Sequence, residues 1–255
     1  MSSRGQPDWF VLIEQATGPT MEHVRDAIEA HVLPIQIKYA PTLAHWFVLD
    51  SLYLANDANR TGMHANALAL TRQCIEAFSV IELGMCGRAD AEDVLQKWWD
   101  DAMTAGQLRK WLSEHVWPAY GSGLWHEPWS EFMANLAAAV HAYAHYTSKL
   151  SQWQLRFHGR SPNASEDEHI IEIRPRAYDA QKATRITLYH GILTYALARM
   201  AIAVRPSVGD EFRALIVRLG KALGQSKYLD GRQTDWPQQF CAMTWSGETG
   251  SPILE

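Results

Sequence analysis

The stretch from Met63 to Leu83 is apolar on nearly every side when it is drawn as a helix. Its apolar residues are spread around the whole circumference, and they include Ala65, Ala67, Leu68, Leu70, Ile75, Phe78, Val80 and Ile81. A helix without a polar face is stable only where neighbouring elements cover all of its sides. The sequence therefore predicts that this segment is the central helix of a bundle.

Helical spacing of apolar residues continues along most of the chain. The pattern predicts a first helix over Pro19–Val32, a long helix from Trp129 to about Trp153, and another from about Tyr178 to Val204. The break at Asn56–Gly62 is short, so the helices on its two sides are expected to form an antiparallel hairpin. We therefore expect an all-α fold, a bundle of about seven helices.

Other segments lack helical spacing. The sequence predicts a single domain over residues 1–255, with irregular structure at residues 1–18 and 231–255 and a flexible loop at 158–168. Ile35–Lys38 and Ile170–Pro175 alternate apolar and polar residues, as short strands do. A two-stranded pairing between these two segments is a further expectation.

The composition excludes several classes of protein. Hydrophobic residues make up 47% and charged residues 20% of the 255 residues, which is typical of a folded globular protein. The net charge of −5 argues against a protein that coats nucleic acid. Cys74, Cys86 and Cys241 show no paired spacing, which suits a reducing compartment.

The N-terminus lacks a signal peptide, and the apolar run Gly191–Val204 contains Arg199 and is too short to span a bilayer, so we expect a cytoplasmic protein with no membrane partner.

Tryptophan is unusually frequent, with 11 residues, and many of them cluster. Indole rings often anchor a core, but they also line binding clefts and partner surfaces. Both interpretations stay open. If the cluster forms a Trp-rich face for a protein or small-molecule ligand, its binding residues are predicted to be Trp111, Trp117, Tyr120, Trp125 and Trp129.

Metal and cofactor chemistry has little support. His141 and His145 are spaced one helical turn apart, which lets two imidazoles reach one ion, but the glutamate of a His-Glu-x-x-His motif is absent. The Glu-x-x-His spacing of di-iron bundles occurs at Glu166–His169, in the predicted loop. No Gly-rich phosphate loop or serine nucleophile motif is present. We expect no metal and no cofactor.

Arg72 and Glu76 are opposite charges four residues apart in the most apolar segment. Such a pair is commonly a structural ion pair that fixes the register of a bundle. The alternative is a polar pocket inside the bundle, in which Glu76 acts as an acid or base.

Two segments resemble known bacterial proteins. The segment Ala67-Leu-Ala-Leu-Thr-Arg-Gln-Cys-Ile-Glu-Ala-Phe78 resembles the central helix of uncharacterised bacterial helical families close to HEPN and abortive-infection proteins. The segment from Leu108 through Trp129 to Thr147 is similar to a block in uncharacterised bacterial proteins. HEPN ribonucleases are helical bundles that cleave RNA without a metal, usually as homodimers. The resemblance implies RNA as substrate and a homodimer.

In that family an arginine and a histidine, four to six residues apart, act together on the RNA backbone. The histidine transfers protons and the arginine stabilises charge on the phosphate. This spacing is met by Arg185–His190, by Arg109–His115 and by Arg25–His31, whereas chance supplies roughly two such pairs. The resemblance favours Arg185 and His190, then Arg109 and His115, with Glu76 as a polar partner. The first expectation remains a non-enzymatic interaction or ligand-binding protein, and a HEPN-like ribonuclease of phage defence or stress response is the alternative.

Overall fold

The computed structural model describes residues 7–141, 143, 145–160 and 169–226. In this part of the chain, nine α-helices, one 3₁₀ helix and a two-stranded sheet are present, which confirms the all-α prediction. In chain order they are α1 (Asp8–Glu29), α2 (Tyr39–Arg60), α3 (His64–Met85), α4 (Ala89–Trp99), α5 (Ala105–His115), η1 (Trp117–Ala119), α6 (Trp129–His141), α7 (Ser148–Gln152), β1 (Leu155–Arg160), β2 (His169–Ile173), α8 (Ala180–Val204) and α9 (Asp210–Gly224).

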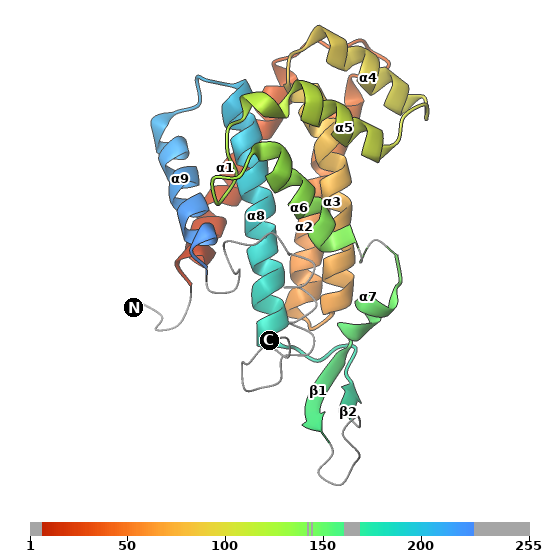
Figure 1. Ribbon diagram of the computed structural model, residues 1–255. Helices are drawn as coiled ribbons and strands as arrows, with labels where there is room; N and C mark the ends of the chain where they lie inside the picture. The colour runs from red at the N-terminus through yellow and green to blue at the C-terminus, as the bar shows by residue number, and fades with distance from the viewer. Residues whose placement is uncertain (1–6, 142, 144, 161–168, 227–255) are drawn as a thin grey trace.

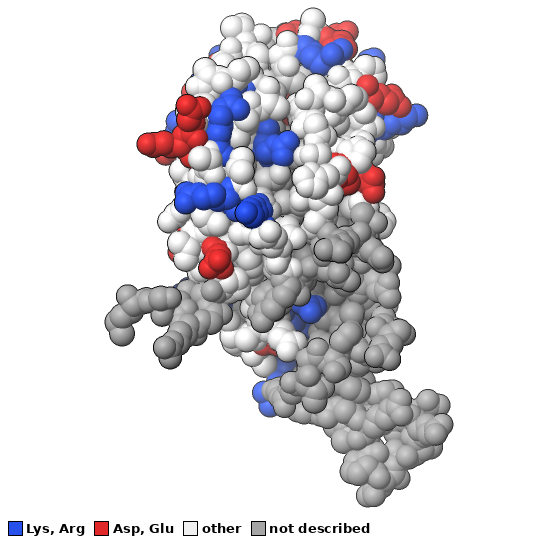
Figure 2. Space-filling model, turned by 60° about the vertical axis from the view of Figure 1, so that its left-hand side comes forward, with Lys and Arg blue, Asp and Glu red and all other residues white. Residues whose placement is uncertain are grey.

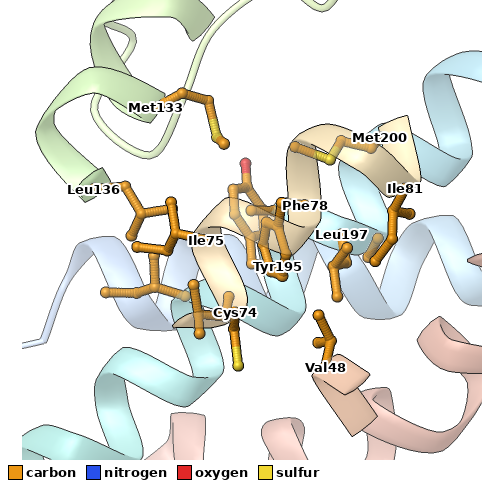
Figure 3. Packing of buried hydrophobic residues seen from close by; sticks show 14 of the residues in the cluster. Val48, Cys74, Ile75, Phe78, Ile81, Met133, Leu136, Tyr195, Leu197 and Met200 are labelled. Carbon is orange, nitrogen blue, oxygen red and sulfur yellow. The ribbon is translucent and has the colours of Figure 1, made fainter. Parts of the chain in front are cut away.

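α3 and α8 stand in the middle of the bundle, with α1, α2, α6 and α9 around them (Figure 1). Figure 3 shows buried side chains of four helices in one cluster: in this view Ile75 of α3 lies next to Leu136 of α6, and Leu197 of α8 lies between Phe78 of α3 and Val48 of α2. The central position predicted for Met63–Leu83 is thus confirmed.

α2 and α3 form the predicted antiparallel hairpin, and they approach each other closely. A Cβ atom on Gly84 would lie 2.3 Å from Cγ of Pro41, so only glycine allows this contact between the end of α3 and the start of α2. The pairing leaves one side of α2 uncovered.

By length and composition, α8 could cross a membrane, with a mean hydropathy of 1.2 over its most apolar 18-residue window. In the fold, however, 78% of that window is buried against other parts of the protein. Its apolar character is therefore accounted for by its central place in the bundle.

The first helix is longer than predicted. α1 begins at Asp8 and passes through Pro19, so residues 8–18 are helical and not irregular. An internal proline removes one backbone hydrogen bond and costs about 3 kcal/mol. Burial of Trp9, Ile13 and Ala16 in the core offsets this cost, because each of these side chains is at most 9% exposed.

The predicted helix over Trp129–Trp153 is in fact two helices. α6 ends at His141, and a separate short helix, α7, begins after Thr147, whose Oγ1 accepts a hydrogen bond from Leu150 N at 3.2 Å. The side-chain cap competes with a continuous helix at this point.

The strand prediction named the wrong partner. β2 pairs antiparallel with β1, and residues 35–38 form a turn that leads into α2. Lys182 of α8 explains the position of β1, because its buried ammonium donates to the carbonyls of Trp153 at 3.0 Å and Leu155 at 2.7 Å. The predicted loop at 158–168 is β1 as far as Arg160. Its remaining residues, and the predicted irregular segments at 1–6 and 231–255, lie outside the described residues.

A buried chain of hydrogen bonds connects α2, α3 and α8. The backbone N–H of Asp179 donates to Nε2 of His64 at 3.0 Å, and Nδ1 of His64 bonds Oδ1 of Asn59 at 2.8 Å. Asn59 Nδ2 then donates to the carbonyl of Ala183 at 3.0 Å. Because Nε2 of His64 accepts, Nδ1 carries the proton and the ring is neutral. Burial lowers the pKa of His64 to about 4, which keeps it in this form.

Candidate functional site

A groove of about 1100 Å³ lies between α2, α3, α4, α5 and the end of α6. Its lining combines charged side chains, aromatic rings and the first residues of a helix. A cavity of this size accommodates an organic molecule, and convergent polar groups in an apolar cavity are typical of ligand sites.

Arg72 is the most buried charged residue of the groove. It lies in the middle of α3 and is only 6% exposed. Its Nη2 donates to Oε1 of Glu76 at 2.8 Å, one turn along the same helix. Nε and Nη1 are buried and have no hydrogen-bond partner in the described part of the chain. A buried cation with two unsatisfied donors therefore borders the groove, and its positive charge favours a negatively charged group there.

Arg109 of α5 brings a second guanidinium to the same groove. Its Nη1 is also buried without a hydrogen-bond partner among the described residues. Burial lowers the pKa of Arg109, the nearby charge of Arg72 lowers it further, and Glu76 opposes these effects. Two cations therefore lie near one carboxylate, which is paired with Arg72, and the groove is locally positive although the chain is acidic overall.

The N-terminus of α5 opens onto the groove beside these arginines, through Thr104, Ala105 and Gly106. Thr104 and Gln107 form a capping box, in which Thr104 Oγ1 accepts from Gln107 N at 3.3 Å. The N–H groups of Ala105 and Gly106 precede that of Leu108, which donates to the Thr104 carbonyl, so they have no acceptor within the helix. Such N–H groups and the helix dipole favour a bound anion.

Apolar side chains form the other walls of the groove. At the end of α4, Trp98 and Trp99 form one wall of the groove, and their ring centroids are 6.4 Å apart. Leu43 and Phe47 of α2 form another wall. Trp99 is 45% exposed, which makes part of its ring accessible to a ligand. The site is therefore suited to a molecule with an anionic end and an apolar body.

His141 and His145 also line the groove, although they are not one turn apart on a helix because α6 ends at His141. Both residues are exposed. Among the described residues, no group of three or more His, Cys, Asp and Glu side chains is placed to hold a metal ion. Their imidazoles are placed to contact a molecule in the groove.

Comparison of the chain with known protein families, curated proteins and solved structures gives no match. The resemblance to the HEPN neighbourhood therefore stays a prediction.

The structure places Arg185 and His190 on α8, away from the groove. His190 is 4% exposed, and both of its ring nitrogens are hydrogen-bonded: Nε2 to Thr71 Oγ1 at 2.6 Å and Nδ1 to Asn56 Oδ1 at 2.8 Å. A histidine that transfers a proton to RNA has to reach solvent. In this position His190 joins three helices and is not open to a substrate.

The second predicted pair, Arg109 and His115, is divided between two places on α5. Arg109 lines the groove, whereas His115 stacks on Trp111 with ring centroids 4.8 Å apart. Nδ1 of His115 bonds the carbonyl of Trp111 at 2.9 Å. Of the five predicted catalytic residues, only Arg109 and Glu76 are brought together.

The predicted Trp-rich face does not form an open surface. Trp117, Tyr120 and Trp129 are at most 8% exposed and belong to the core, while Trp111 and Trp125 are partly buried. Polar contacts inside the protein satisfy two of the indoles: Trp117 donates to both oxygens of Glu82 at 3.0 Å, and Trp125 donates to the carbonyl of Gly224 at 3.0 Å. The accessible tryptophan of the groove, Trp99, was not among the predicted ligand residues.

One face of the molecule is shown with its charges in Figure 2. Basic side chains gather in its upper half, acidic ones lie toward its margins, and most of the described surface between them is uncharged. Proteins that coat nucleic acid carry a more continuous basic surface.

Proposed function

We propose that this protein binds a small organic anion in the groove between α2, α3, α4 and α5. The observation that carries the proposal is Arg72, which is more than nine-tenths buried at the groove and has two donor nitrogens without a partner in the described chain. A buried, incompletely bonded cation destabilises a fold. Residues of this kind occur where binding requires them.

Three features of the groove lining determine the charge of the ligand. Arg72, Arg109 and the N-terminus of α5 all favour negative charge, and Glu76 is the one carboxylate in the described lining. A carboxylate or phosphate group accepts the paired donors of a guanidinium. The anionic end of the ligand therefore lies between Arg72 and Arg109.

The rest of the ligand is apolar. Trp98, Trp99, Leu43 and Phe47 offer ring and aliphatic surface, and the volume of about 1100 Å³ is far larger than an inorganic phosphate needs. An aromatic or branched aliphatic carboxylate satisfies both parts of the site. Binding by such a groove agrees with the predicted class of ligand-binding helical protein, at a site other than the predicted Trp face.

Replacing Arg72 with methionine should weaken binding of the anion and leave the fold at least as stable. A suitable probe is 2-naphthoate, an aromatic carboxylate with one anionic end and an apolar body. Because the variant loses the charged hydrogen bonds to the carboxylate, its affinity for 2-naphthoate should fall by about tenfold to a hundredfold. It also removes an incompletely bonded buried cation, so the free energy of unfolding should stay level or rise by about 1 kcal/mol. Titration calorimetry and urea unfolding measure the two effects.

The matched control is Arg218→Met, which removes an exposed charge from α9 outside the groove. This control should bind 2-naphthoate as the wild type does, and the neutral 2-naphthamide should bind the wild type more weakly. An Arg72→Met variant that keeps full affinity for 2-naphthoate would contradict the proposal. A variant that loses stability instead would mean that Arg72 is a structural residue.

A second candidate, metal-independent cleavage of RNA, is favoured by one observation: His141 and His145 line the same groove as the two arginines. A histidine and a cation beside a phosphate are the groups that this chemistry needs. If the groove cleaves RNA, a mixed-sequence RNA in EDTA is degraded by the wild type, and His141→Ala or His145→Ala slows this by at least about a hundredfold. His190→Ala, a change outside the groove, should then slow RNA cleavage much less than these two variants do. Intact RNA after incubation with the wild type would remove this candidate.

A further inference from the structure

α2 carries an apolar stripe along its outer side. Six large side chains recur at helical spacing over its length, and each is between 44% and 74% exposed although it belongs to a helix of the bundle. Apolar patches of this extent are rarely left in water by monomeric proteins. The stripe consists of Tyr39, Leu43, Trp46, Phe47, Tyr53 and Leu54.

We propose that the stripe is a homodimer interface, on which the α2 helix of a second copy of this chain packs. Large aromatic and aliphatic side chains each present on the order of 200 Å² when fully exposed. Six of them, about half exposed, leave roughly 600–700 Å² of apolar surface on each copy. A standard specific interface buries about 800 Å² per partner, so the stripe and its rim provide the area that a stable dimer needs.

The charges at the two ends of α2 suit an antiparallel pairing. Lys38 precedes the helix and is exposed, and Asp57 lies in its last turn, on the same side as the stripe, where one of its oxygens also accepts a hydrogen bond from Arg60 Nη2 at 2.7 Å. In a two-fold pairing centred near Trp46 and Phe47, Lys38 of each copy comes close to Asp57 of the other. The same centring separates the two copies of Asp50, the acidic residue in the middle of the stripe, and avoids a direct repulsion between them.

The stripe is also continuous with the groove. Leu43 and Phe47 belong to both, since each is exposed on α2 and lines the cavity. A second copy packed on α2 therefore borders the mouth of the groove and narrows it. The dimer itself does not depend on the proposed ligand, because its area and charges come from α2 and from Lys38, which directly precedes it.

Sedimentation velocity of the full chain tests the interface. At micromolar concentration the wild type should sediment as a dimer of twice 28.8 kDa. Trp46→Glu places a charge in the centre of the stripe, and it should weaken dimerisation by at least about a hundredfold and give a monomer. Because Trp46 is 53% exposed, the variant should keep the wild-type circular dichroism spectrum, and its unfolding midpoint should not depend on protein concentration.

Val217→Glu is the matched control. Val217 is 70% exposed on α9, so this variant should remain a dimer. A wild type that is monomeric at this concentration would overturn the proposal and leave the stripe to another segment of the chain or to a different protein. A Trp46→Glu variant that stays dimeric would place the dimer interface elsewhere and would overturn it equally.

Discussion

Lowering the pH from neutral toward 4 should unfold the protein, because two buried histidines have to take up protons. Burial lowers the pKa of both His64 and His190 to about 4, whereas a histidine in an unfolded chain titrates near 6.5. The folded state therefore binds fewer protons than the unfolded state between these values. Their stabilising contribution is complete above about pH 6.5 and is lost as the pH falls to about 4.

The expected effect is large. Lowering the pKa of one histidine from 6.5 to about 4 corresponds to roughly 3 kcal/mol, so the two rings together account for roughly 6–7 kcal/mol, which is comparable to the whole stability of many domains. Urea unfolding at a series of pH values measures it. In His190→Gln, the slope of the free energy of unfolding against pH should be shallower by about 1.4 kcal/mol per pH unit. His115→Gln, at an exposed position, should leave this slope unchanged. The buried Glu82 carboxyl, whose pKa is raised to about 7, changes the stability of the wild type in the opposite direction over this range, so the decisive series uses the Glu82→Gln variant. If the free energy of unfolding of Glu82→Gln is constant between pH 7 and pH 5, the account of these two histidines is refuted.

Replacing Glu82 with glutamine should stabilise the protein at alkaline pH. The Glu82 carboxyl is fully buried, and burial raises its pKa to about 7, although the two hydrogen bonds from Trp117 oppose this. For a raised pKa the stabilising contribution is complete below the unfolded value, near 4.5, and is lost as the pH rises through about 7. At pH 8 the charged form therefore costs about 3 kcal/mol.

Glutamine keeps an oxygen that accepts from Trp117 and has no charge to bury. The unfolding free energy of Glu82→Gln should exceed that of the wild type by up to about 3 kcal/mol at pH 8 and by close to zero at pH 4.5. Glu131→Gln, an exposed change on α6, should alter neither value. If Glu82→Gln is less stable than the wild type at pH 8, the buried carboxylate contributes more through its hydrogen bonds than it costs.

The sequence predicted the bundle because helix formation and burial leave a periodic pattern. The run from Met63 to Leu83 has no polar face, and this alone places α3 at the centre. The pattern failed where tertiary contacts override local preference. Pro19 lies inside α1 because Trp9 and Ile13 are buried on the helix before it, and Thr147 starts a new helix where the apolar spacing continued.

The groove was less predictable, because it is assembled from residues far apart in the chain. The spacing of Arg72 and Glu76 indicated a polar feature in α3, and Arg109 was selected for its distance from His115. Nothing in the sequence shows that Arg72 and Arg109 share one cavity, since α4 and the start of α5 lie between them. One feature of the sequence could have indicated the groove. The large apolar residues of α2 occupy most of its faces, including one that the bundle leaves exposed, and two of them, Leu43 and Phe47, line the groove.

The most direct test of the anion-binding groove is a titration of the protein with 2-naphthoate, followed by nitrogen-detected spectra of the arginine side chains. The Nε resonance of Arg72 is assigned by its absence in Arg72→Met. If the groove binds the anion, the signals of Arg72 and Arg109 shift together and saturate at one ligand per chain, while Arg218 does not move. If those two signals stay in place while the ligand binds elsewhere or not at all, the groove is not the binding site.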